Sequence, residues 1–316
     1  MNIAYHIIAW SQPDLLKRMV SRLNQPNVHF FIHIDKKNKD YPSYKPYFDD
    51  FNNVTLLSEY EVYWGGLSQV KTAMHLLTLA CNFPMQFKYH VLLSGQDYPI
   101  KPNSYINNFF EAHSCDFMSY NRIADLPDIY LKKYQYHHFF DNKLLNPKDP
   151  RKNKLLYYLF NGFYNRFGKY LPKRSFYKDY TPYFGSDWLV LSDGSARFIL
   201  DFTKRNPDYV RFMKYNEIPS ELYIHNILLN SERRTNVVDY DRFQEWLKHK
   251  KPGDVFMPRY ASLRYMDWSD TGQATKPAFL DATYFDVIKN DPNLFARKMH
   301  ETISAELLDK IDVELL

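Results

Sequence analysis

The sequence has few cysteines and no long apolar run. Cys81 and Cys115 are its only two cysteines, which excludes a disulfide-stabilised scaffold and is consistent with a reducing compartment. No window approaches the ~18 uninterrupted apolar residues of a membrane-spanning helix. The first residues enter a predicted strand without the basic region and apolar stretch of a signal peptide. These absences predict a cytoplasmic protein and leave peripheral association with the inner face of the plasma membrane open.

The net charge is also modest. The chain has 41 Lys and Arg against 36 Asp and Glu, which gives +5. This balance suits an anionic ligand or a membrane surface, but it is too small to indicate nucleic acid binding. Aromatic residues, in contrast, are abundant at 18% of the chain. Aromatic rings stack on the apolar faces of sugars, although most of them must fill the core.

The N-terminal part of the chain predicts a βαβ unit. Apolar residues fill 3–10 and 28–34, and helical spacing of apolar residues follows over 15–23. Two parallel strands joined by a helix end at the same edge of a sheet. Trp10 should therefore lie beside Asp35, where the two turns are placed to hold a nucleotide base and ribose. The alternative is that Asp35 only ends its strand.

The stretch 89–101 combines a buried strand with a polar turn. Its apolar β-formers stop at Ser94, and Asp97 follows in the turn. This turn falls at the carboxyl edge of the sheet, where open α/β folds bind ligands, so we expect Asp97 to contact substrate. A cap of the turn is its alternative role. Further strands over 54–57 and 116–120, alternating with helices, predict an α/β sandwich with a mostly parallel sheet.

Small residues mark two further loops. Gly65 precedes a helix expected over 69–81, for which Ser68 is placed as the N-cap. Gly185 begins a second loop, which leads through Asp187 into another strand. Both loops are expected at the ligand edge, where a carboxylate such as Asp187 can orient sugar hydroxyls.

Glu221 lies at the start of a helix that we expect to run to about residue 229, with Ser220 as its cap. Negative charge is favoured there by the helix dipole, so a structural role is open. A carboxylate that faces a cleft from this position is equally usable as a general base. Local sequence does not separate the two roles.

The regular alternation of predicted strands and helices stops over 121–180, a segment that is rich in Tyr, Lys, His and Phe. The segment holds one amphipathic helix, over 154–168, and is predicted to be an acceptor-binding lid. The adjacent His137 and His138 point to different faces of any regular element, which argues against a shared metal.

Cations then gather toward the C-terminus and either lie at the surface or converge on a phosphate. They are Arg264, Lys276, Arg297 and Lys298.

Seven motifs together resemble the core-2 and I-branching β-1,6-N-acetylglucosaminyltransferase family, which also contains the peptide O-xylosyltransferases. They are FFIHIDK (30–36), WGGLS (64–68), LLSGQDYPIK (92–101), GSDW (185–188), IPSE (218–221), RYMDW (264–268) and LFARK (294–298). The resemblance covers nearly the whole chain in the same order. The low cysteine content agrees with bacterial members, which lack the disulfides of the secretory-pathway enzymes.

The resemblance implies a single glycosyltransferase A-type domain, with residues 1–120 as the half that binds the nucleotide sugar and 121–316 as the half that binds the acceptor and carries catalysis. It implies an inverting transfer from a UDP-sugar to a glycan or glycolipid acceptor, without a metal or other cofactor. Glu221 would be the catalytic base. The other expected site residues are Ala9, Trp10 and Asp35 for uridine, Arg264, Lys276, Arg297 and Lys298 for the diphosphate, and Trp64, Gly65, Ser94, Asp97, Gly185, Ser186, Asp187 and Trp188 for sugar or acceptor.

The favoured donor is UDP-N-acetylglucosamine, because the family is named for it, with UDP-xylose, UDP-glucose and UDP-galactose as alternatives. The acceptor would belong to a bacterial surface polysaccharide. Other classes of function remain open. Asp97 and Glu221 would be the paired carboxylates of a glycoside hydrolase, and a non-catalytic sugar-binding relative would keep the fold alone. Asp239 and Asp241 form an Asp-X-Asp sequence and are the alternative candidates for a metal site.

Overall fold

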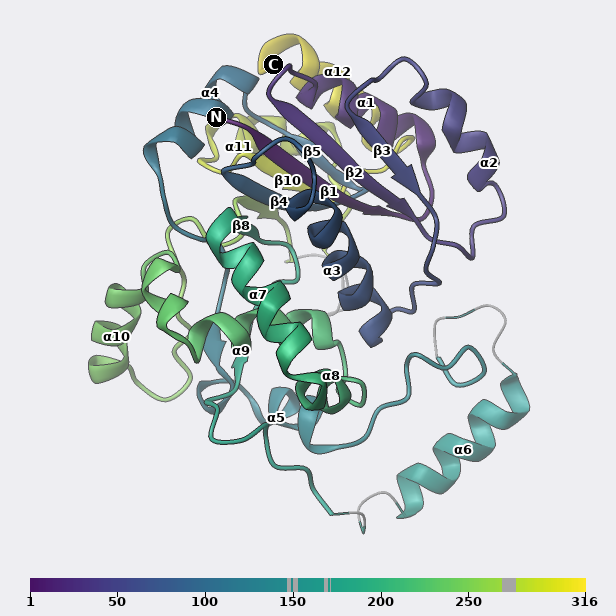
Figure 1. Ribbon diagram of the computed structural model, residues 1–316, viewed down its shortest axis with the longest axis vertical. Coiled ribbons are helices and arrows are strands. Elements are labelled where there is room, and N and C mark those ends of the chain that lie inside the picture. Colours follow the sequence, from purple (N-terminus) through teal and green to yellow (C-terminus); the bar gives the residue numbers. More distant parts are fainter. Residues whose placement is uncertain (147–148, 150–152, 168–169, 171, 269–276) are drawn as a thin grey trace.

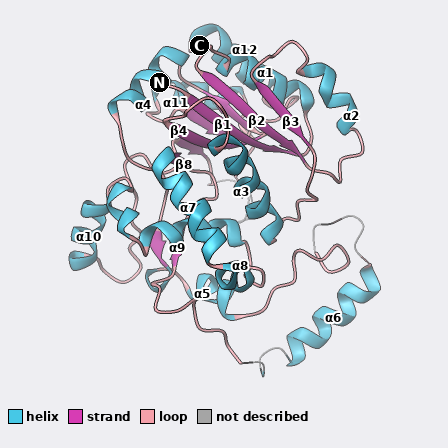
Figure 2. Ribbon diagram, in the orientation of Figure 1, coloured by secondary structure: helices cyan, strands magenta, loops and turns pink. Residues whose placement is uncertain are grey.

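In a computed structural model, the chain folds around a five-stranded sheet with the order β3-β2-β1-β4-β8 (Figures 1 and 2). The structure describes residues 1–146, 149, 153–167, 170, 172–268 and 277–316. Its strands are β1 (Ile3–Ala9), β2 (Val28–Ile34), β3 (Val54–Leu57), β4 (Tyr89–Ser94) and β8 (Val190–Ser192). All neighbours are parallel except β4 and β8. The predicted mostly parallel sheet flanked by helices is confirmed.

The three central strands form because nearly every position in them is apolar. Residues of β2 are buried along its whole length, as expected for a strand covered on both faces. Alternate side chains serve the two faces: Tyr5 and Ile7 of β1 belong to one core cluster, and Ala4 belongs to another. The sheet therefore separates two layers of helices.

The layer that covers one face comprises α1 (Pro13–Leu23), α4 (Asn103–Ala112), α11 (Phe285–Asn290) and α12 (Ala305–Glu314). On the other side lie α3 (Leu67–Cys81), α7 (Asp193–Arg205), α8 (Pro207–Met213), α9 (Tyr223–Leu229) and α10 (Tyr240–His249). The remaining helices are α2 (Tyr41–Tyr44), α5 (Asp128–Gln135) and α6 (Lys154–Phe167), together with the 3-10 turns η1 (Lys45–Tyr47), η2 (Ile123–Asp125), η4 (Pro219–Glu221), η5 (Glu232–Asn236) and η6 (Ala282–Tyr284). Among the residues that the structure describes, no helix is both long enough and apolar enough to cross a bilayer.

A second sheet brings the C-terminal segment beside the end of β4. Its central strand, β10 (Phe295–Arg297), pairs antiparallel with β5 (Asp97–Pro99) and parallel with β9 (Arg264–Met266). Asp97 was expected in a turn, but it begins β5 because β10 supplies a partner strand. The pairing places Arg297 opposite Asp97 and Phe295 opposite Arg264.

Three local predictions are wrong. Residues 116–120 form only isolated bridges, from Asp116 to Val237 and from Phe117 to Val190, instead of a strand. Ser68 does not cap α3, because the helix begins one residue earlier and the Asp141 carboxylate accepts hydrogen bonds from the Leu67 and Ser68 amides, each at 3.0 Å. Ser220 does not cap a helix either: it lies inside η4, and its buried hydroxyl has no hydrogen-bond partner among the residues that the structure describes.

The segment 121–180 has little regular structure, as predicted. It contains β6 (Asn121–Arg122), which pairs antiparallel with β7 (Tyr183–Phe184), and the helices α5 and α6. The bounds of α6 match the amphipathic helix expected there. Figure 1 shows α6 at the edge of the molecule, away from the central sheet. The role of this segment as an acceptor-binding lid remains a prediction.

Candidate active site

A cavity of about 520 Å³ opens at the carboxyl edge of the central sheet. Side chains that follow the ends of β1, β2 and β4 form its wall, as expected for an open α/β fold. Its lining comprises Ile8, Ala9, Trp10, Ser11, Asp35, Lys37, Val62, Trp64, Gln69, Ser94, Gly95, Gln96, Asn146, Asp149 and Trp188. Ala9, Trp10, Asp35, Trp64, Ser94 and Trp188 among them are residues that the sequence predicts for the site.

The turns after β1 and β2 meet as predicted. The Asp35 amide donates to the Ala9 carbonyl at 2.9 Å. Asp35 Oδ1 accepts from the Lys37 amide at 2.9 Å, and Lys37 Nζ lies 3.5 Å from Asp35 Oδ2. The same ammonium group lies 5.3 Å from the Trp10 ring centre, and Trp10 is 47% exposed. This corner presents a flat aromatic surface, a carboxylate and a cation, which suits a heteroaromatic base with its ribose.

Asp97 does not face the cavity. It is fully buried, and Asp97 Oδ2 accepts from the Ser94 amide at 2.6 Å and from the Ser94 hydroxyl at 2.7 Å. Asp97 Oδ1 accepts from Arg264 Nε at 2.8 Å, and Asp97 Oδ2 lies 3.5 Å from an Arg297 Nη1. The expectation that Asp97 binds a sugar hydroxyl is therefore wrong for this structure. Its alternative role, to hold the turn after β4, fits the contacts.

The same geometry revises the assignment of Arg264. Its side chain is fully buried and donates to Asp97 and to the backbone carbonyls of Leu92 and Ser262. Burial lowers the pKa of Arg264, and the Asp97 carboxylate opposes that shift. Arg264 therefore supports the turn from behind and is not placed to contact a diphosphate in the cavity.

Arg297 is better placed for an anion. Its guanidinium donates to the Ser94 hydroxyl and lies 4.7 Å from the Trp188 ring centre, and both of those residues line the cavity. The side chain is 16% exposed. Lys298 Nζ lies 4.5 Å from the Phe279 ring centre. Lys276 falls outside the residues that the structure describes.

Glu221 ends η4, and Leu222 separates it from α9. Its side chain is 25% exposed, and Glu221 Oε2 lies 3.3 Å from Lys133 Nζ. Burial raises the pKa of Glu221 to about 7; Lys133 opposes the rise and the Asp187 carboxylate adds to it. A carboxyl group that titrates near neutrality can accept a proton from a hydroxyl at physiological pH.

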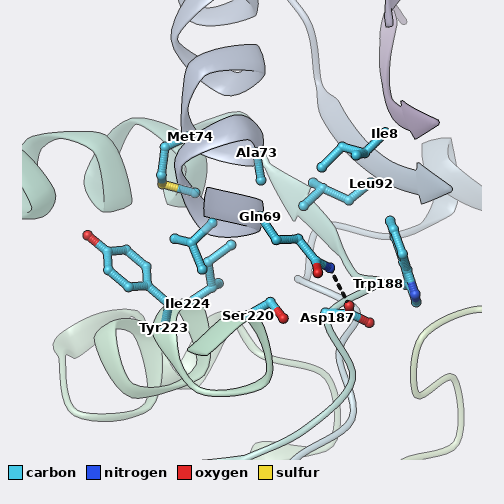
Figure 3. A pocket seen from close by; sticks show the side chains of 11 residues that line it. Ile8, Gln69, Ala73, Met74, Leu92, Asp187, Trp188, Ser220, Tyr223 and Ile224 are labelled. Atoms are coloured by element: carbon cyan, nitrogen blue, oxygen red, sulfur yellow. Dashed lines mark hydrogen bonds between the residues drawn. The ribbon is translucent and has the colours of Figure 1, made fainter. Parts of the chain in front are cut away.

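A small cavity beside the Glu221 segment shares part of its wall with the main cavity. It has a volume of about 20 Å³, and its wall includes Asp187 and Ser220, the neighbour of Glu221 (Figure 3). Ile8, Gln69 and Trp188 line both cavities. Figure 3 shows the Gln69 amide directed at Asp187, and Gln69 Nε2 donates to Asp187 Oδ2 at 2.6 Å.

The loop that begins at Gly185 holds Asp187 beside Glu221. The Gly185 amide donates to the Glu221 carbonyl at 3.0 Å, and the Ser186 amide donates to Ser119 Oγ at 2.8 Å. A Cβ at Gly185 would lie 1.9 Å from the Ser119 carbonyl oxygen, so only glycine fits this approach. The loop is thus fixed by backbone contacts, and Gly185 and Ser186 contribute geometry to the site.

Trp64 and Gly65 connect the cavity with the Glu221 segment. Trp64 is 42% exposed, lines the cavity and packs against Phe140, with 6.0 Å between ring centres. Gly65 has φ +74°, and its carbonyl accepts from the Ile218 amide at 3.0 Å. An exposed indole at the mouth of a cavity is a suitable stacking surface for a sugar.

Sequence reasoning missed several residues of this site. Lys37, Gln69 and Asn146 line the cavity, and Lys133 contacts Glu221. Lys37 had a usable signal, because it directly follows a strand that ends at the ligand edge. Gln69 also had one, since it lies in the first turn of a helix after a glycine pair. Nothing local distinguishes Asn146 or Lys133 from the other polar residues of the segment 121–180.

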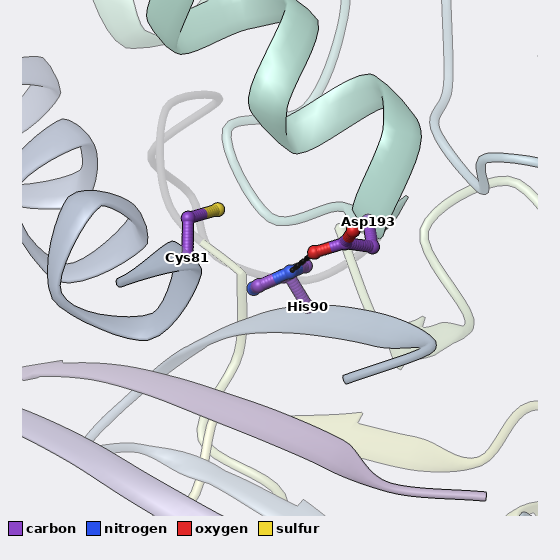
Figure 4. Close-up of side chains that lie close together, drawn as sticks. All are labelled: Cys81, His90 and Asp193. Carbon is purple, nitrogen blue, oxygen red and sulfur yellow. Dashed lines mark hydrogen bonds and ion pairs between the residues drawn. The ribbon is translucent and has the colours of Figure 1, made fainter. Parts of the chain in front are cut away.

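The candidate metal ligands lie away from this cavity. Within the described part of the chain, one group of three potential ligands comes together, Cys81, His90 and Asp193, and none of them lines the cavity (Figure 4). His90 Nε2 lies 3.2 Å from Asp193 Oδ1, so a hydrogen bond already occupies these two groups. Burial raises the pKa of the Cys81 thiol to about 11, which disfavours the thiolate that a metal requires.

The alternative Asp-X-Asp site is also poorly suited to a metal. Asp239 Oδ2 accepts from an Arg242 Nη1 at 2.8 Å, and Asp239 Oδ1 accepts from an Arg259 Nη2 at 3.0 Å. These arginines already neutralise the carboxylate, and their contacts lower its pKa against the effect of burial. Neither Asp239 nor Asp241 lines the cavity.

Comparison with known proteins gives a family match over most of the chain. The model of the family described as Branch, Core-2/I-Branching enzyme, matches residues 3–288. Xylosyltransferase 1 of Rattus norvegicus is 24% identical over 317 residues, which cover 94% of this chain and 33% of the relative. The chain thus spans about a third of the length of that curated relative.

Two further similarities are more limited. A β-1,3-galactosyl-O-glycosyl-glycoprotein β-1,6-N-acetylglucosaminyltransferase of Danio rerio is 28% identical over 104 residues, which cover 32% of this chain and 24% of the relative. Among solved structures, the galactosyltransferase LgtC in complex with donor and acceptor sugar analogs has a TM-score of 0.39 at 9% identity. That alignment covers 100% of this chain and 96% of the other.

Proposed function

This chain belongs to the Core-2/I-Branching enzyme family of glycosyltransferases, and we propose that it transfers a sugar from a UDP-sugar to a glycan hydroxyl with inversion at the anomeric carbon. Glu221 is the general base of this reaction. The proposal depends above all on one observation: the carboxyl group of Glu221 has a pKa of about 7, and its neighbours Ser220 and Asp187 line a small cavity that shares part of its wall with the main cavity.

The proposed step follows from the position of Glu221. The deprotonated carboxylate accepts the proton of the acceptor hydroxyl, while the hydroxyl oxygen forms a bond to the anomeric carbon. The bond from that carbon to the diphosphate oxygen breaks on the opposite face, and UDP leaves with the electron pair. Lys133 holds the base in place through its ion pair with Glu221, and Asp187 keeps the pKa of the base near neutrality.

The departing diphosphate needs fixed positive charge if no metal supplies it. Arg297 is the best placed of the predicted cations, because it contacts Ser94 and Trp188 at the cavity wall. Lys298 follows it in the chain and is the second candidate. Arg264 is excluded from direct contact by its burial behind Asp97. Lys37, which the sequence did not indicate, adds a cation at the nucleotide end of the cavity.

The identity of the sugar is a finer proposal. N-acetylglucosamine remains the sugar that we propose, because a relative that carries that name is similar over part of this chain. Xylose has support from the xylosyltransferase that is similar over nearly the whole chain. Glucose and galactose, the other donors in the prediction, have no observation that favours them.

The hydrolase alternative loses its geometric basis. Two carboxylates that flank a glycosidic bond must both reach the substrate. Asp97 is fully buried and bonded to Arg264, so it cannot pair with Glu221 across a sugar. A sugar-binding relative without activity differs from the proposed enzyme by the absence of turnover.

The test is a calorimetric titration of the purified chain with UDP, once with excess EDTA and once with Mn²⁺. Equal affinity in both conditions is expected if fixed cations hold the diphosphate. Binding that requires Mn²⁺ would overturn the metal-independent proposal, and no binding in either condition would overturn the UDP-sugar donor. A turnover screen with UDP-N-acetylglucosamine and UDP-xylose on glycan acceptors then identifies the donor. If neither hydrolysis nor transfer is detected with either donor, the non-catalytic sugar-binding alternative would replace the proposed enzyme.

We also propose a cytoplasmic location in a bacterium, where the enzyme would act on a surface polysaccharide. Cys81 and Cys115 are both free thiols, as suits a reducing compartment. Fractionation of cells that express the native protein tests this location. Recovery outside the cytoplasmic and inner-membrane fractions would contradict it.

A further inference from the structure

Helix α6 exposes an apolar stripe that no described part of the chain covers. Five large apolar side chains are exposed on this helix, and four of them follow one another at spacings of four residues, which places them along one side. They are Leu155 (68% exposed), Leu156 (45%), Leu159 (60%), Phe163 (64%) and Phe167 (45%). The stripe is continuous, since Phe163 and Phe167 pack against each other with 4.9 Å between ring centres. Such a patch on a protein surface marks an interaction site.

Aromatic residues that border the stripe anchor α6 to the rest of the molecule. Phe160 packs edge-on against Phe139, with 5.3 Å between ring centres, and it stacks on Tyr164. The Tyr164 hydroxyl accepts from the His137 amide at 3.0 Å. Phe160 and Tyr164 therefore attach the helix, and the five residues of the stripe stay exposed. The helix does not need the stripe in order to pack.

Positive charge is concentrated in the segment of the chain that contains this stripe. The segment 121–180 contains thirteen Lys and Arg against five Asp, a net charge of +8, although the whole chain carries only +5. The rest of the chain is therefore slightly acidic, at −3. Lys154 and Arg166 lie on α6 itself, and both are exposed. A basic segment that carries an exposed apolar helix face is complementary to an anionic, amphipathic surface.

We propose that the α6 stripe, defined by Leu155, Leu156, Leu159, Phe163 and Phe167, docks into the interface of a membrane that contains anionic lipids. The leucine and phenylalanine side chains enter the boundary between headgroups and acyl chains, and the exposed Lys154 and Arg166 contact the lipid phosphates. A helix of this length lies in the plane of the interface and does not span the bilayer.

The helix that carries the stripe also lies close in sequence to a residue of the cavity wall. Asn146, just before α6, lines the cavity and donates to the Trp64 carbonyl at 2.9 Å. The chain therefore passes from the cavity wall directly into the segment that leads to the membrane-docking helix. If the proposed transferase function holds, docking through α6 brings the enzyme to acceptors that are anchored in the membrane. The docking itself does not depend on that function.

The experiment is a vesicle flotation assay with the full chain and two lipid compositions, pure phosphatidylcholine and phosphatidylcholine with phosphatidylglycerol. We expect flotation with the anionic vesicles, at least tenfold weaker association with the neutral ones, and a decrease as salt increases. The double variant Leu159→Glu/Phe163→Glu should lose at least tenfold in association. The control Val313→Glu changes an apolar residue of α12 that is 84% exposed and should bind like the unchanged protein.

Calorimetric UDP binding by the double variant shows whether its fold is intact and separates a failure of docking from a failure of the proposed function. Absence of flotation with anionic vesicles would overturn the proposal. Equal flotation of the double variant and the unchanged protein would also overturn it. A dimer in light scattering that the double variant dissociates, without vesicle binding by the unchanged protein, would assign the stripe to a second copy of this chain instead.

Discussion

Lys133 Nζ lies 3.3 Å from Glu221 Oε2, and yet the pKa of Glu221 is raised to about 7. Burial outweighs the nearby cation at this carboxylate, and Asp187 adds to the effect. The balance matters because a general base must lose its proton before it can accept another. Two predictions follow directly from this pair of residues.

The first concerns pH. In its proposed role as the base, Glu221 works only when it is deprotonated, so kcat/KM should rise with pH and level off above pH 7. Lys133→Met removes the cation that favours the charged form, and the rising limb should move to higher pH. Lys132→Met, at an exposed position one residue earlier on α5, should leave the profile in place. If the rising limb of the pH profile stays at the same pH in Lys133→Met, Lys133 does not influence the pKa of the base.

The second concerns the base itself. Glu221→Gln keeps the size of the side chain but cannot accept the proton, so turnover should fall by a factor on the order of 10² or more. UDP affinity, measured by calorimetry, should be retained because Glu221 does not line the nucleotide end of the cavity. Glu232→Gln, on the exposed turn η5, is the matched control. Loss of UDP binding in Glu221→Gln would instead indicate a structural role.

The buried pair Asp97–Arg264 should support stability. Asp97→Asn leaves the fully buried guanidinium without its carboxylate, and the free energy of unfolding in urea should fall by about 3–5 kcal/mol. The exposed pair Asp201–Arg205 is the comparison, since Asp201→Asn should cost less than about 1 kcal/mol. Unchanged stability in Asp97→Asn, together with a higher KM, would restore the expectation that Asp97 contacts the sugar.

Trp10 should contribute to nucleotide binding. Its exposed ring lies at the corner formed by Asp35 and Lys37, where a base can stack on it. Trp10→Ala should weaken UDP binding on the order of tenfold, from the usual range for stacking of a base on an aromatic side chain. Tyr105, similarly exposed at 46%, lies on α4 away from the cavity, and Tyr105→Ala should leave the affinity unchanged. Equal affinities of the two variants would argue against this base position.

Gly185 should be intolerant of a side chain. In Gly185→Ala the new methyl group would overlap the Ser119 carbonyl and contact His225, so the loop must shift at a cost of about 1–3 kcal/mol in unfolding free energy. Turnover should fall as well, because the Gly185 amide holds the Glu221 carbonyl. Gly162→Ala, on exposed α6 with nothing within 4 Å, should instead stabilise the helix by up to about 1 kcal/mol. Thermal and urea unfolding compare the two.

Sequence reasoning predicted the main elements of the sheet because their signals are local. The apolar run of β2 and the helical spacing of α1 are properties of neighbouring residues. The contact between the turns at Ala9 and Asp35 also followed, since parallel strands joined by a helix must end at one edge. Ser68 and Ser220 show the limit of such reasoning: each resembles a helix cap, but the helices begin elsewhere.

By itself, the sequence determined the fold class, the ligand edge of the sheet and the family, because periodicity and motif order are written along the chain. Only the tertiary structure decided which carboxylate is exposed. Asp97 and Arg264 are separated by 167 residues, and β10 brings their strands together, so Asp97 is buried where the local turn suggested a ligand contact. Lys133 reaches Glu221 in the same way, across 88 residues. The pKa of a side chain depends on such distant neighbours and on burial, and neither is a property of adjacent residues.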